Sequence, residues 1–213
     1  MNAAVASAAG AYGGQMGMGV SRARGVMRQV LALGVGLLVV GALRAPEAFG
    51  ADSLEARQQA HLCASLQKEP AIAACRRALE LGLSRERAAA AYLLLALNFS
   101  TLNRWPEVVD AYRERLRLLP QDAETHWRLG DALLFGLSQP KEALIPLQEA
   151  VRLKPDLPGA HGSLGVALAS SGAYVEAVAA FDEAVRLDPQ YFANRPAAKQ
   201  VYEAARKGER WAR

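Results

Sequence analysis

The sequence has little of the chemistry that enzymes use most often. Its 213 residues include two cysteines and three histidines. The cysteines, Cys63 and Cys75, are too far apart to form a redox Cys-x-x-Cys motif, and no Cys or carboxylate stands at metal-ligand spacing from the histidines. No paired acid–base set, nucleophile elbow or glycine-rich phosphate loop is found. We therefore expect a protein that is not an enzyme and has no cofactor or metal; an enzyme with an unrecognised site is disfavoured.

An excess of charge of one sign is also nearly absent. The formal net charge is +4, but residues 1–50 hold four arginines against the single acid Glu47, so they account for +3 of it. The remainder is close to neutral, which argues against nucleic acid as a partner. A local cluster at Arg113, Arg115 and Arg117 is interleaved with acids, as is typical of a solvated, salt-bridged helix face.

The sequence contains one long apolar run. Three arginines precede Val30–Leu43, a run of 14 residues, and Ala48-Phe49-Gly50 follows with small residues ahead of Ala51. A positive start, an apolar middle and a small-residue exit indicate a secretory signal peptide. The run is shorter than the roughly 20 residues that span a bilayer as a helix. We expect cleavage near Gly50-Ala51 and a periplasmic or secreted protein.

Two alternatives concern the same leader, residues 1–50. If it is not cleaved, residues 30–43 would anchor the protein in the inner membrane, facing the periplasm. Residues 1–26 are rich in Ala and Gly without periodicity, and a start at Met27 would give a leader of ordinary length. Residues 1–26 are therefore interpreted as a disordered lead-in or an over-extended start.

The most informative feature of the sequence is a short motif that occurs twice. Residues 126–133 (HWRLGDAL) and 161–168 (HGSLGVAL) share five positions that recur at helical spacing. Each is followed by a second shared phrase, at 149–155 (EAVRLKP) and 183–189 (EAVRLDP). A fixed period near 34 residues is typical of stacked helical repeats.

These residues resemble the tetratricopeptide repeat, a helix–turn–helix unit marked by a Leu-Gly pair in its first helix and by Ala, an aromatic, Ala and Pro in its second. The last repeat, 158–191, matches with the residues His161, Leu164, Gly165, Leu168, Tyr174, Ala177, Phe181, Ala184 and Pro189. The resemblance implies an all-α fold, a short right-handed superhelix of tetratricopeptide-like repeats with a C-terminal capping helix.

Two further repeats, 123–157 and 89–122, complete a block of three over 89–191. The middle one has Leu147 where an aromatic is usual and one extra residue in its turn, around residues 136–140. The earlier one has Val108 and Arg115 at the two small positions of its second helix, which predicts looser packing there.

Both ends of the block are atypical, as in most repeat arrays. Residues 51–88 form a degenerate leading helix pair without the Leu-Gly motif. Residues 192–213 hold a capping helix and tail, with Pro196 at a helix start and Gly208 as its stop.

Cys63 and Cys75 lie at equal distances from the midpoint of the leading pair's turn. In an antiparallel hairpin they would be level, so a disulfide is geometrically possible, and an oxidising compartment would favour it. Two buried free thiols are the alternative.

By the resemblance, the first helix of each repeat lines a concave groove that binds a protein or peptide. The predicted partner-binding residues are Leu93, Leu97, Thr101, Glu124, Trp127, Asp131, Leu134 and Val166. Ser100, Phe135, Gly162, Ala169 and Ser170 belong to the same helix faces. Trp127 stands where the next repeat has Gly162, so repeat packing does not demand it, and an aromatic on a groove is a typical interface anchor. The alternative is that Trp127 packs against the N-terminal repeat or lies half-exposed without a binding role.

The family's carboxylate clamp, which grips a terminal carboxylate with Lys, Arg and Asn, is not found, because these groove positions carry no Lys or Arg. We expect a non-catalytic interaction module or assembly scaffold that binds an apolar or weakly basic segment, with Glu124 and Asp131 at the rim. The alternative is a membrane-anchored interaction subunit of an envelope complex, held by residues 30–43.

Overall fold

The computed structural model describes residues 52–209, which belong to one compact unit. The predicted leader, its cleavage position and the start at Met27 lie outside the described residues. Residues 52–209 form nine α-helices and one π-helical turn and contain no strand. The prediction of an all-α repeat fold is confirmed.

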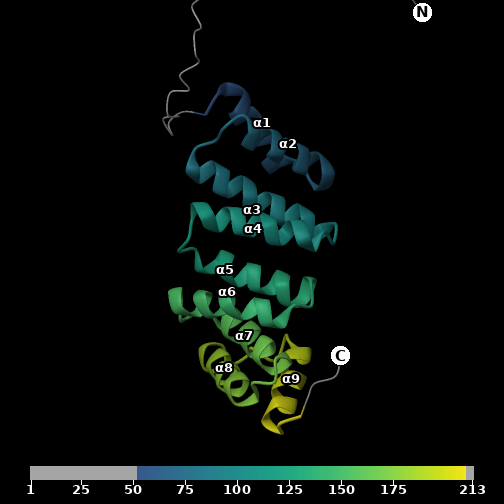
Figure 1. Ribbon diagram of the computed structural model, residues 1–213, viewed down its shortest axis with the longest axis vertical. Coiled ribbons are helices and arrows are strands. Elements are labelled where there is room, and N and C mark those ends of the chain that lie inside the picture. The colour runs from purple at the N-terminus through teal and green to yellow at the C-terminus, as the bar shows by residue number, and fades with distance from the viewer. Residues whose placement is uncertain (1–51, 210–213) are drawn as a thin grey trace, which may run out of the picture. The chain divides into compact units, whose positions relative to one another are not determined.

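The helices follow one another as antiparallel pairs, and each packs on its neighbours in the chain (Figure 1). Their bounds are α1 Leu54–Ser65, α2 Lys68–Glu80, α3 Arg85–Thr101, α4 Trp105–Leu118, α5 Ala123–Asp131, η1 Ala132–Gly136, α6 Pro140–Leu153, α7 Pro158–Ser170, α8 Tyr174–Leu187 and α9 Pro196–Arg206. Four pairs and one single helix therefore make up this unit.

Glycines in the first helices allow the two helices of a pair to approach closely. A Cβ placed on Gly130 would lie 2.4 Å from Cγ of Leu147, and one on Gly165 would lie 2.9 Å from the Phe181 ring. Leu147 and Phe181 are both fully buried. The large residue of the second helix thus fills the space that the missing side chain leaves, which explains why the two positions recur together.

The two recurring histidines have a structural role. Nε2 of His126 donates a hydrogen bond to the carbonyl oxygen of Pro120 at 2.9 Å, and Nε2 of His161 donates to that of Pro155 at 2.8 Å. Each imidazole ties the start of a repeat to the proline that ends the preceding one. Within residues 52–209, no group of three or more His, Cys, Asp or Glu side chains is arranged to hold a metal ion.

The prediction of looser packing at Val108 and Arg115 is wrong. Val108 is almost fully buried. The Arg115 guanidinium donates to the Ala89 carbonyl at 2.7 Å, to the Thr125 hydroxyl at 2.7 Å and to the Asp122 carboxylate at 2.8 Å. Its planar array of N–H groups satisfies acceptors from three elements at once, so a large polar residue links α3, α4 and α5 where other repeats use a small one.

The leading pair is closed by a covalent bond. Cys63 of α1 and Cys75 of α2 form a disulfide with a Cα–Cα distance of 4.7 Å, and both residues are buried. The pair is also joined to the next helix, because the buried carboxylate of Asp52 accepts from the Ser84 backbone N–H and forms an ion pair with Arg87.

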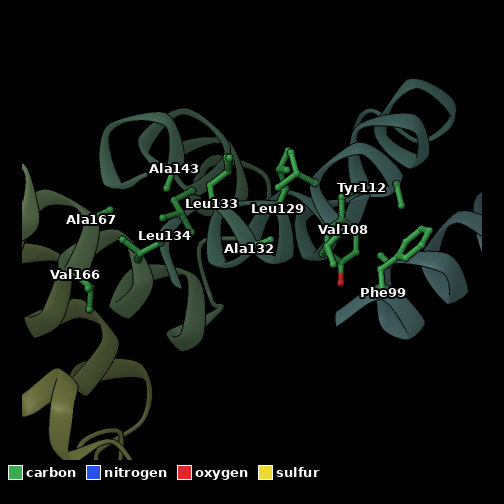
Figure 2. Packing of buried hydrophobic residues seen from close by; sticks show 14 of the residues in the cluster. Phe99, Val108, Tyr112, Leu129, Ala132, Leu133, Leu134, Ala143, Val166 and Ala167 are labelled. Atoms are coloured by element: carbon green, nitrogen blue, oxygen red, sulfur yellow. The ribbon is translucent and has the colours of Figure 1, made fainter. Parts of the chain in front are cut away.

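A continuous apolar core runs through the repeats. Figure 2 shows Phe99, Val108 and Tyr112 at one side and Val166 and Ala167 at the other, joined by side chains of α5, η1 and α6. At the C-terminal end, the Tyr202 ring lies 5.7 Å from the Phe181 ring, centroid to centroid. The capping helix α9 thereby covers the last pair.

Candidate binding groove

A pocket of about 650 Å³ opens between α5, η1, α7 and the segment that leads into α9. We call it the α5–α9 pocket. The residues that define it are Trp127, Asp131, Phe135, Ser163, Val166, Tyr191, Asn194, Arg195 and Val201. Its volume is within the range of sites that hold small ligands or a few side chains.

The predicted groove residues divide into two groups. Trp127, Asp131 and Val166 come together in this pocket, although they belong to two different repeats. Leu93, Leu97 and Thr101 lie on α3, outside it.

The α3 residues and Glu124 make local contacts. Leu97 is exposed, Leu93 is half-buried, and the Thr101 hydroxyl donates to the Asn98 carbonyl at 2.7 Å. Glu124 is exposed and pairs with Arg128 at 2.6 Å. These residues extend the face of the first helices but add no wall to the pocket.

The prediction that Leu134 binds a partner is wrong. Its exposed fraction is 0%, so it cannot contact a partner. Figure 2 shows it among core side chains, near Leu133 and Ala143. Ala169, its counterpart in the regular helix α7, is also buried, so this position faces the core in both repeats. Leu134 belongs to the π-helical turn, in which the Leu137 N–H donates to the Ala132 carbonyl at 3.0 Å, five residues back. The wider turn holds one extra residue.

Phe135, which belongs to the same turn, lines the pocket and is 54% exposed. The extra residue expected in the turn near 136–140 is thus accommodated partly inside the helix. Gly136 is required there, because a Cβ would lie 2.5 Å from the Trp105 ring. Phe135 is the large aromatic that this repeat presents to solvent.

Trp127 packs against the following repeat and not against the N-terminal one. Its indole Nε1–H donates to the Ser163 hydroxyl at 3.2 Å. A Cβ on Gly159 would lie 2.4 Å from the indole ring, so glycine there makes room for it. Trp127 is therefore half-buried and forms a wall of the pocket rather than a free anchor.

Gly162, the counterpart of Trp127, is covered by a residue from outside the repeats. A side chain at Gly162 would overlap the hydroxyl of Tyr191. Tyr191 in turn carries Arg195, whose Cζ lies 4.6 Å from its ring centroid. Both aromatic walls of the pocket thus rest on glycines of α7.

Asp131 is the charged residue deepest in the pocket. Burial raises its pKa from the ordinary 3.8 to about 6, although Ser163 and the positive charge of Arg128 act in the opposite direction. Among residues 52–209, no hydrogen-bond donor reaches its buried Oδ1, and no ion pair includes it. A buried carboxylate oxygen without a donor is energetically unfavourable and rare in proteins.

Sequence reasoning missed Tyr191, Asn194, Arg195 and Val201. They follow the last repeat, so the repeat pattern gives no information about them. The only available signal was the pair Tyr191-Phe192 just after Pro189, since adjacent aromatics outside the periodic segment need their own packing site. Arg195 also means that the pocket does contain an arginine, in contrast to the prediction.

Within the described residues, no helix combines the length and the apolar character that a bilayer crossing requires.

Residues 134–192 match the sequence family described as tetratricopeptide repeat. Superkiller protein 3 of Schizosaccharomyces pombe is 34% identical over 120 residues, which are 53% of this chain and 8% of that protein. The chain therefore spans less than a tenth of the length of this curated relative.

Several solved structures are similar to the chain. YrrB, described as a TPR protein with an unusual peptide-binding site, is 27% identical with a TM-score of 0.56, over 74% of this chain and 86% of YrrB. MamA of Desulfovibrio magneticus RS-1 is 20% identical with a TM-score of 0.60, over 74% and 93% of the two chains. The TPR2B domain of yeast Sti1, solved in complex with an Hsp70 peptide, is 24% identical with a TM-score of 0.51, over 56% and 96%. The last two show a shared fold.

Proposed function

Because this chain is a tetratricopeptide-repeat protein, we propose that it is a non-catalytic module that binds a segment of a partner protein in the α5–α9 pocket. The observation that carries the proposal is the exposure of Phe135, 54% of its side chain, beside a preformed pocket with aromatic walls. Large exposed aromatics next to a concavity are typical of interface anchors.

The comparisons support a peptide as the ligand. YrrB is described as having a peptide-binding site, and the Sti1 domain was solved with an Hsp70 peptide. Neither finding identifies the partner of this chain. Part of the wall of the site proposed for it comes from Tyr191 and Arg195, which follow α8.

A selection from a displayed peptide library on the full chain tests the proposal. Enriched peptides should bind the wild type and lose at least about 10-fold in affinity to Phe135→Asp, since loss of one aromatic anchor commonly costs that much. Val175→Asp is the matched control, because Val175 on α8 is 82% exposed and lies outside the pocket. Equal binding to both variants would place the ligand elsewhere.

We also propose that the protein acts in the periplasm or outside the cell, after removal of the leader near Gly50-Ala51. Support comes from the leader's sequence and from the Cys63–Cys75 disulfide, which persists in oxidising compartments. Cell fractionation with N-terminal sequencing tests this. Recovery of the intact leader in membranes would favour the anchored alternative, and a reduced protein in the cytosol would overturn both.

A further inference from the structure

We propose that the α5–α9 pocket takes up one lysine or arginine side chain of the bound segment, with the Asp131 carboxylate as its counter-ion. This inference rests on the proposed function and specifies its ligand chemistry. Such a pocket binds a positively charged group, whereas a carboxylate clamp binds a negatively charged one.

The first step is the state of Asp131. Its Oδ1 is buried with no hydrogen-bond donor within residues 52–209, and the carboxylate forms no ion pair there. The neighbouring repeat has Val166 at the same position, so stacking of the helices does not require an acid. An ammonium or guanidinium group in the pocket would supply both a positive charge and N–H donors.

The second step concerns the two nearby cations, since a free arginine would already serve as counter-ion. Arg128 donates two hydrogen bonds to Glu124, at 3.2 and 2.6 Å. Arg195 lies over the Tyr191 ring and donates to the Tyr191 carbonyl at 3.5 Å. Both side chains are engaged elsewhere, so their positive charges act on Asp131 without a direct ion pair, and the exposed position of Arg195 allows solvent to screen its charge from an incoming cation.

The third step is the lining between Asp131 and solvent. Val166 and Val201 are apolar, while Trp127 and Phe135 are aromatic. The aliphatic stem of a lysine or arginine packs well on such surfaces, and its charged head is attracted to aromatic faces. A glutamate or aspartate would instead bring a second negative charge beside Asp131, which disfavours acidic segments.

The experiment uses short peptides, acetyl-Leu-X-Leu-amide, with X as Lys, Arg, norleucine or Glu. Norleucine keeps the apolar stem of lysine without its charge. Binding to the full-length ¹⁵N-labelled protein is followed through the indole N–H signal of Trp127, which bonds to Ser163 inside the pocket. The signal is assigned with Trp127→Phe. We expect the Lys and Arg peptides to bind about 10- to 100-fold more tightly than the norleucine peptide, the range of a buried charge pair.

Asp131→Asn is the decisive variant, because it keeps the shape and removes the charge. It should abolish the preference for Lys over norleucine. Glu142→Gln is the matched control, since it removes one negative charge from an exposed position on α6 outside the pocket, leaves Arg128 held by Glu124 and should leave the preference unchanged.

Each other outcome overturns a distinct statement. Equal binding of Lys and norleucine peptides would reject the counter-ion and leave the proposed function intact. Tighter binding of the Glu peptide would assign the pocket to a carboxylate held by Arg195. Failure of all four peptides, together with failure of the library selection, would reject the proposed function itself.

Discussion

At the scale of single residues, Asp131 makes the stability of the unliganded protein depend on pH in an unusual direction. Its folded-state pKa is about 6, above the ordinary 3.8, so the folded state binds the proton more tightly than the unfolded state does. The ionised carboxylate therefore destabilises the fold above about pH 6, and this penalty disappears as the pH falls toward 4.

We predict that Asp131→Asn raises the free energy of unfolding at pH 7.5, by on the order of 1–3 kcal/mol. At pH 4 the difference from wild type should be close to zero, because the folded wild type is already protonated there. Urea denaturation at both pH values measures this. A gain of equal size at both would mean that the amide stabilises for another reason.

Arg115 is the second residue with a specific prediction. Burial opposes the ionised form of Asp122, but hydrogen bonds from Arg115 and Thr125 outweigh it and lower the pKa of Asp122 below 3.8. The stabilisation from this network is therefore present above pH 4 and is lost as the pH falls through the lowered pKa.

Replacing Arg115 with Met should destabilise the protein by about 2–4 kcal/mol, since it removes the charged donor of the partly buried Asp122 carboxylate and of the Ala89 carbonyl. Arg113→Met is the control. Arg113 lies two residues away, is exposed and only approaches Asp110 at 3.7 Å, so its loss should cost less than about 0.5 kcal/mol. Similar losses in both variants, by chemical denaturation, would contradict this role for the network.

The residues of the site show what sequence reasoning can reach. Trp127, Asp131 and Val166 could be predicted to share a surface, because they occupy the inner face of successive first helices. Leu134 was placed wrongly because this position of the first helix is buried in both repeats, as its counterpart Ala169 shows. Tyr191 and Arg195 could not be predicted, since their position depends on how a non-repeating segment folds back on α7.

At the scale of elements, the α1–α2 pair has a disulfide in addition to its apolar contacts. It is the most degenerate pair, and its residues Leu54 and Leu66 remain exposed. A cross-link that closes a loop of this size stabilises by roughly 3 kcal/mol in the chain-entropy model.

We predict that Cys63→Ala/Cys75→Ala opens α1 and α2 before the other helices, whereas binding in the α5–α9 pocket is unaffected. Hydrogen exchange of both proteins, with the peptide titration above, distinguishes the two effects. Loss of peptide binding in the double variant would show that the ends of the array are coupled.

The π-helical turn is the second element with a testable role. Removing Leu137 would align Ser138, which has a φ of 55°, with Gly172, which has a φ of 88°, and would restore the period of the neighbouring repeat. We predict that this deletion folds but weakens peptide binding by at least about 10-fold, because Phe135 changes direction. Leu137→Ala keeps the turn length and serves as the control. Unchanged affinity after the deletion would exclude the turn from the site.

At the scale of the whole described unit, the fold was predictable because its information is repeated. The spacing of Leu-Gly pairs and prolines gives the helix pairs, and Gly130 and Gly165 give their contacts with Leu147 and Phe181. In such arrays each unit contacts mainly its neighbours, so stability is close to a sum of local terms. The pocket does not follow from that rule, because it forms where the repetition ends.

The contact between Gly162 and Tyr191 has a consequence for how such a protein can change its partner. The repeats supply a scaffold in which the absence of a side chain at Gly162 gives Tyr191 room to pack. A segment of about ten residues, 191–201, supplies about half of the residues that line the pocket. Exchanging residues 191–201 would therefore alter ligand preference without touching the residues that hold the helix pairs together. Specificity in this chain therefore has two sources, Asp131 on the repeat scaffold and a segment after α8 whose sequence can change independently of it.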